Sequence, residues 1–209
     1  MALTFPYPLA FLSAHIKETQ IPLGLRRFDE TSGTARGQVW SARLATPLWT
    51  ATVPLVARSW AEAREVDAKI LALDGMAKTF LWADPVYLPA AGGAPGDGVI
   101  VSAIAPDRTA VALSGLPAGY AVAIGDRLSI AHSAGRIWFA TFAEAGVADA
   151  SGTLSALSVY PYVHLGVATG DAVEMARPSF KAMVEDYTGF TAMPGRYAQG
   201  ASLTLLQKV

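Results

Sequence analysis

One helical pattern in this chain of 209 residues limits the folds open to it. Ser59 and Glu62 have the spacing of a capping box, in which the serine side chain accepts from the glutamate amide and the glutamate reaches back to the serine amide. Gly75 is placed to end the helix in a left-handed conformation. The pattern predicts an amphipathic helix over about 60–73. Its apolar positions share one face: Ala63, Val66, Ile70 and Leu73.

The other patterned segments have the periodicity of strands. From Leu48 to Leu55, apolar residues alternate with threonines, as in a strand with one buried face. Pro54 has no amide N–H, which places that end at a sheet edge or at the exit of the strand. One helix among many strands predicts a mainly β fold. The same reasoning predicts further strands at 37–44, 79–84, 99–104, 109–113, 126–130, 136–142, 153–160, 174–185 and 203–208.

A Gly/Pro-rich stretch over 90–98 has no hydrophobic period and is typical of a linker. The short, turn-separated strands after it favour a small barrel or sandwich, and the last strands can rejoin the first sheet. We therefore predict a β-sandwich or barrel core with one α-helix packed on it, built from residues 1–91 and 166–209. Residues 92–165 are predicted to form an inserted, small β-barrel-like domain.

The low proportion of charged residues indicates which kinds of partner the protein has. Hydrophobic residues make up 52% of the chain and charged residues 16%, against about 25% charged in an average protein. Apolar surface with so few charges favours an oligomer or a subunit of a larger assembly. The net charge is −1 and no run of Lys or Arg occurs, which excludes the electrostatic footprint of a nucleic-acid binder.

The absence of cysteine excludes disulfides, thiolate chemistry and cysteine metal sites. No apolar run approaches the ~20 residues of a membrane span, and the N-terminus has no basic region of the kind that opens a signal peptide. We expect a soluble protein that is made in the cytoplasm and does not insert into a membrane.

The sequence has none of the common motifs of catalytic, metal or phosphate-binding sites. The histidines His15, His132 and His164 have no partner at metal-ligand spacing. No serine lies in a G-x-S-x-G context, and the glycines of 92–98 are not followed by the G-K-[ST] of a phosphate loop. We therefore predict no catalytic residue, no metal site and no cofactor, and a protein that is not an enzyme.

Aromatic residues leave a second interpretation open. A sugar-binding module would stack its ligand on exposed aromatic rings, whereas these residues mostly alternate with small or polar ones, as core residues do. Trp138 and Tyr162, within the predicted insertion, are the candidates for a ligand or partner contact. The full aromatic set considered is Trp40, Trp49, Trp60, Trp82, Trp138, Tyr160 and Tyr162.

The order of these features resembles the distal tail and minor tail proteins of long-tailed bacteriophages. A W-x-x-x-V-x-L strand at 49–55 leads into a helix that ends in an L-x-G turn at 73–75. A T-F-x-x-x-D-P segment at 79–85 follows, and then the linker. Three later segments are similar to the G-D-x-(apolar), G-R-(apolar) and x-x-P marks of that family: 124–130, 135–138 and 159–161.

The resemblance spans residues from about 40 to 185 and implies a structural virion protein at the distal end of the tail. Such proteins form a ring, commonly hexameric, that joins the tail tube protein to the baseplate hub or fibres. The ring surrounds the channel for the tape-measure protein and DNA, and it has no active site. The alternative is a carbohydrate-binding adhesion module of a tail or surface assembly.

Overall fold

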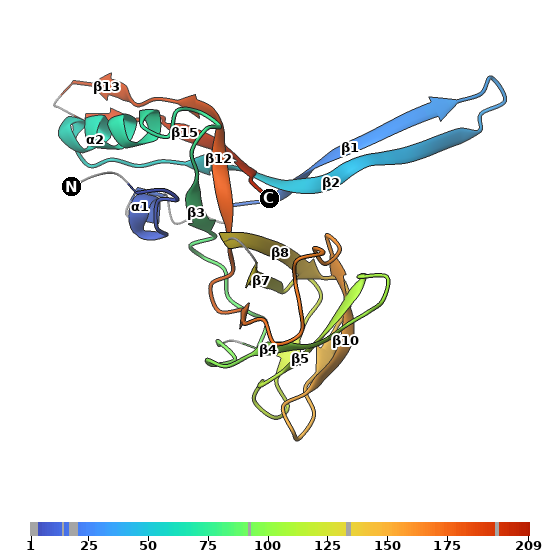
Figure 1. The fold of residues 1–209 in the computed structure, drawn as a ribbon. Helices are drawn as coiled ribbons and strands as arrows, with labels where there is room; N and C mark the ends of the chain where they lie inside the picture. The colour runs from blue at the N-terminus through green and yellow to red at the C-terminus, as the bar shows by residue number, and fades with distance from the viewer. Residues whose placement is uncertain (1–3, 14, 17–20, 92, 133–134, 195–196) are drawn as a thin grey trace.

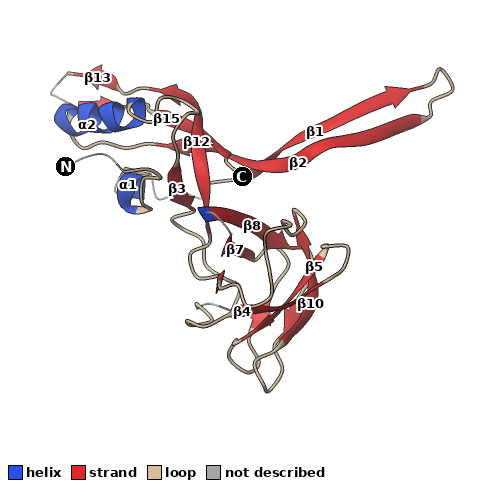
Figure 2. Ribbon diagram, viewed as in Figure 1, coloured by secondary structure: helices blue, strands red, loops and turns tan. Residues whose placement is uncertain are grey.

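The computed structural model describes residues 4–13, 15–16, 21–91, 93–132, 135–194 and 197–209. Strands account for 46% of the chain and helices for 9%, so the mainly β prediction is confirmed (Figure 2). In the described part of the chain, no helix is both long and apolar enough to cross a membrane.

The first sheet has five antiparallel strands in the order β1-β2-β15-β12-β3. The predicted strands 37–44 and 48–55 are one continuous strand, β2, which ends at Pro54 as predicted. The late strands β12 and β15 lie between β2 and β3, so the chain closes its first sheet with its last residues. The five strands are β1 (Gly24–Gly33), β2 (Val39–Pro54), β3 (Phe80–Ala83), β12 (Ser179–Thr188) and β15 (Ser202–Gln207).

The predicted helix is α2 (Trp60–Leu71), which packs on the first sheet through Ala63, Val66 and Ile70. The Ser59 side chain accepts from the Glu62 amide at 3.2 Å, as a capping box requires. The glutamate accepts from the amide of Arg58 at 2.7 Å rather than from that of Ser59. The helix therefore begins where predicted. Gly75 has the predicted positive φ but lies beyond the C-cap, Ala72.

The second sheet lies below the first (Figure 1) and has the order β11-β7-β8-β10-β5-β4. It encloses its own hydrophobic cluster, whose residues run from Val99 to Met175 and so continue past residue 165. The strands are β4 (Ile100–Ile104), β5 (Ala110–Ser114), β7 (Arg127–His132), β8 (Arg136–Phe142), β10 (Leu154–Tyr160) and β11 (Val173–Glu174).

Short elements complete the fold. Residues 10–13 form a short helix, and two small two-stranded sheets lie outside the main sheets. These elements are α1 (Ala10–Ser13), β6 (Ala121–Val122) paired with β9 (Gly146–Val147), and β13 (Thr191–Met193) paired with β14 (Tyr197–Gln199).

The two sheets meet through specific contacts. Phe139 of β8 belongs to the hydrophobic cluster of the first sheet, and its carbonyl accepts from the Trp49 indole at 3.1 Å. Its ring makes an edge contact with Phe180 of β12, with centroids 5.1 Å apart. Arg127 of β7 forms an ion pair with Asp84 at 2.7 Å, just after β3. The sheets are therefore held together by both apolar and charged contacts.

The first two strands extend well beyond the body as a two-stranded ribbon, which we call the arm (residues 26–48; Figure 1). Their pairing runs from Gly24 opposite Thr50 to Gly33 opposite Val39. The strand β15 pairs with β2 only over residues 50–54, so among the described residues the outer arm has no third strand. The strand β1 is not among the strands predicted from the sequence.

Candidate functional site

The arm presents an apolar stripe to solvent. Side chains alternate between the faces of a strand, so Trp40, Ala42 and Leu44 of β2 share one face. Two of them face polar residues of β1, with Ser32 opposite Trp40 and Glu30 opposite Ala42, while Leu44 lies at the register shift between Phe28 and Asp29. The exposed fraction is 57% for Trp40 and 67% for Leu44. This stripe is therefore uncovered in a single copy of the chain.

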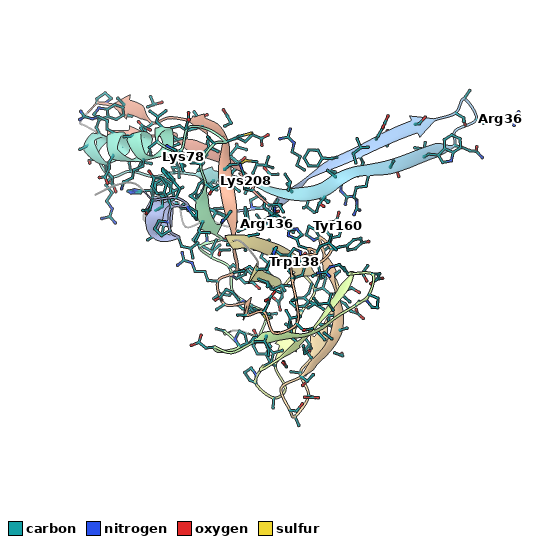
Figure 3. The ribbon with its side chains drawn as sticks, viewed as in Figure 1. Arg36, Lys78, Arg136, Trp138, Tyr160 and Lys208 are labelled. Atoms are coloured by element: carbon teal, nitrogen blue, oxygen red, sulfur yellow. The ribbon has the colours of Figure 1, made fainter. Side chains whose placement is uncertain are left out.

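An isolated two-stranded ribbon is at best marginally stable in water, because it has no core of its own. In this chain the arm is rooted in the first sheet, where alternate residues of β2 are buried from Pro47 onward. Arg36 lies at the far tip, remote from the rest of the molecule (Figure 3). A projecting ribbon with exposed apolar side chains is typical of a surface that binds a partner.

A hollow of about 340 Å³ lies at the base of the arm. Its walls come from segments far apart in the sequence: the arm, β7, β8 and the loop after β10. We call this hollow the basic pocket. The charged and aromatic side chains of its lining are Arg43, His132, Arg136, Tyr162 and His164.

The two histidines of the basic pocket make an edge-to-face contact, with ring centroids 5.8 Å apart. Burial, together with electrostatic repulsion from His132, Arg136 and Arg108, lowers the pKa of His164 to about 4. Burial also lowers the pKa of His132, with Asp171 opposing the shift. Both imidazoles are therefore mostly neutral at pH 7, and the field around them is positive.

Arg108 is fixed behind the basic pocket by backbone carbonyls. Its guanidinium donates to the carbonyl of Val163 at 2.9 Å and to that of Val167 at 2.8 Å, and also to the carbonyl of His164. These bonds order the loop that carries Tyr162 and His164. They use the Nε and Nη2 donors without neutralising the charge, so Arg108 still contributes to the positive field.

The two predicted contact residues have different surroundings. Trp138 is fully buried in the cluster of the second sheet, and its indole donates to the Tyr162 carbonyl at 3.1 Å. The Tyr162 ring is 47% exposed, with the Arg43 guanidinium 5.7 Å from its centroid. Of the pair, only Tyr162 can touch a ligand, while Trp138 fixes the backbone beneath it.

The third histidine lies elsewhere: the Nδ1 atom of His15 is 3.3 Å from a Glu62 carboxylate oxygen at the start of α2. Sequence reasoning missed that His132 and His164 meet beside two arginines. Within the residues that the structure describes, no group of three or more His, Asp or Glu side chains is placed to hold a metal ion.

No model of a known protein family matches the sequence, and a search of curated proteins finds no significant match.

Proposed function

We propose that the chain is a structural protein of a bacteriophage tail tip, and not an enzyme. Copies of it would form a ring that joins the tail tube to the baseplate hub or fibres and surrounds the channel for the tape-measure protein and DNA. The observation that carries the proposal is the arm, whose Trp40 and Leu44 are exposed on a ribbon without a core. The order of the sequence features supports it independently.

The direction of the arm suits a head-to-tail contact between copies. Closed rings of this kind join two different patches of each subunit. The helix α2 lies at the opposite end of the first sheet from the tip of the arm (Figure 1). Exposed apolar side chains also gather there, including Leu71 at the end of α2 and Met76 after it. The arm of one copy and the α2 end of the next would form the ring contact.

The charge balance supports a channel that lets DNA pass. A lumen with strong positive charge would bind DNA through its phosphates. The chain has a net charge of −1, with its basic residues scattered along the sequence. A ring of such subunits would hold DNA weakly, as a passage requires.

We further propose that the second sheet is an inserted domain with its own barrel-like core, and that the first sheet and α2 form the ring-building core. Separate hydrophobic clusters support this division. Hydrogen exchange tests it: the amides of β7, β8 and β10 should open as one unit, with a free energy distinct from that of β12 and β15. A single common opening free energy for both sheets would contradict the division.

Ring formation is tested by light scattering coupled to size exclusion, with negative-stain images of the peak. We expect a mass near six times the 21.9-kDa subunit and a central hole. The double variant Trp40→Ser/Leu44→Ser should elute as a monomer, because it removes the apolar stripe of the arm. A matched control is Ile124→Ser, which changes a side chain that is 70% exposed outside the arm.

Two results would contradict the proposal. One is a wild-type chain that stays monomeric at every concentration tested. The other is an arm variant that keeps the mass of the ring, which would show that the arm does not join the subunits. Circular dichroism of each variant verifies that the fold is intact before the masses are compared.

A further inference from the structure

The basic pocket brings together Arg43 and Arg136, and Val209, whose α-carboxylate ends the sequence, also lines it without an ion pair to either arginine in the described part of the chain. Among the described residues, its lining includes no aspartate or glutamate side chain. Neither Arg43 nor Arg136 forms an ion pair within the described part of the chain. Asp171 lies outside this lining, and its negative charge raises the pKa of His132. Its carboxylate accepts a hydrogen bond from the Ala168 amide. Like charges held together in this way are stabilised when an anion binds between them.

The two arginines favour a carboxylate as that anion. A guanidinium is planar and offers paired donors that match the two oxygens of a carboxylate. Arg43 comes from the arm and Arg136 from the start of β8, so they approach the pocket from different elements. An anion held between them would also tie the base of the arm to the second sheet.

The rim and size of the pocket favour a sugar as the carrier of the carboxylate. The Tyr162 ring is partly exposed beside Arg43 and stands edge-on to Tyr160, with centroids 6.1 Å apart. An aromatic ring with a polar tip suits a ligand that has both an apolar face and hydroxyl groups. The volume of about 340 Å³ lies at the lower end of the range for small-molecule sites, roughly 300–1,000 Å³.

We propose that the basic pocket binds an acidic monosaccharide, with its carboxylate between Arg43 and Arg136 and its ring against Tyr162. A single-stranded nucleic acid fits the pocket less well, because such sites need a charged groove and several stacking rings along the strand. This proposal goes beyond ring formation and holds equally for a monomer or a ring. It gives the protein a role in contacting an acidic glycan surface.

Calorimetric titration of the full chain with glucuronate, galacturonate and N-acetylneuraminate tests the proposal, with glucose and inorganic phosphate as controls. We expect at least one acidic sugar to bind and both controls to fail. NMR titration of the imidazoles gives a second readout. A bound carboxylate favours the imidazolium, so the pKa of His164 should rise from about 4 when the sugar is present.

Variants locate the site. Arg43→Gln and Arg136→Gln should each weaken binding by about tenfold or more, since each removes a charge-assisted bond. Arg36→Gln is the matched control, because it makes the same change at the far tip of the arm (Figure 3). Light scattering on the same samples reports ring formation separately, so failure of one proposal is distinguishable from failure of the other.

Three results would overturn the proposal. The first is that none of the acidic sugars binds. The second is that phosphate binds as tightly as the best sugar, which would mark a general anion site. The third is that Arg36→Gln weakens binding as much as the two pocket variants do, which would mean that overall charge rather than the pocket attracts the ligand.

Discussion

Asp84→Ala should lower the free energy of unfolding by about 3–5 kcal/mol, because it leaves a charge unpaired at the junction of the two sheets. Asp84 is 7% exposed, and its Oδ2 atom accepts from Arg127 Nη1 at 2.7 Å. Its other oxygen accepts from the Val86 amide at 3.2 Å. The Tyr87 ring covers the guanidinium, with its centroid 4.9 Å from Arg127 Cζ. Water is therefore poorly placed to replace the carboxylate.

Urea denaturation at neutral pH measures this loss. Asp97→Ala, at an exposed aspartate, is the matched control and should change stability by no more than about 0.5 kcal/mol. Replacing Asp84 and Arg127 together by leucine and methionine should recover much of the loss, because no unpaired charge then remains. If Asp84→Ala were as stable as the control, the ion pair would contribute nothing to holding the sheets together.

The predictable parts of the fold are those in which one face is buried and the other is not. The Trp49–Pro54 half of β2 shows this alternation, and so does α2 with its cap at Ser59. The strand β1 was not predicted because both of its faces are largely exposed. Its sequence therefore has no alternation of apolar and polar residues. A ribbon that projects into solvent cannot be recognised by a method that looks for a buried face.

Pro47 explains why β2 was predicted as two strands. A proline lacks the N–H that a central strand would use, so it normally marks a break. Here it lies at an irregularity in the pairing, between Ala45 opposite Phe28 and Leu48 opposite Arg26. The strand β15 has not yet joined β2 at that point. A local bulge at a sheet edge therefore accommodates the proline, and the strand continues.

The basic pocket could be predicted only in part. His132 and Arg136 are directly paired across the β7–β8 hairpin, so the turn between them could have placed these two side chains together. His164 and Arg43 reach the same place through the loop after β10 and through the arm. Nothing in their local sequence connects them, because their meeting depends on how the two sheets pack.

The largest contrast we expect is between Trp138 and Tyr162, which sequence analysis treats as equivalent candidates. Trp138→Ala should cost about 3–5 kcal/mol of unfolding free energy, since it removes a fully buried ring from the cluster of the second sheet. It also leaves the Tyr162 carbonyl without its indole donor. The truncation therefore combines a cavity with a lost hydrogen bond.

Tyr162→Ala removes a half-exposed ring and should cost no more than about 1 kcal/mol, yet it should weaken binding of the acidic sugar. Thermal and urea unfolding of both variants, together with the sugar titration of Tyr162→Ala, measure the contrast. If Tyr162→Ala were destabilised as much as Trp138→Ala, the tyrosine would be part of the core and the pocket would have no aromatic rim. A stable Tyr162→Ala that bound no sugar would instead separate the residue that supports the site from the residue that contacts the ligand.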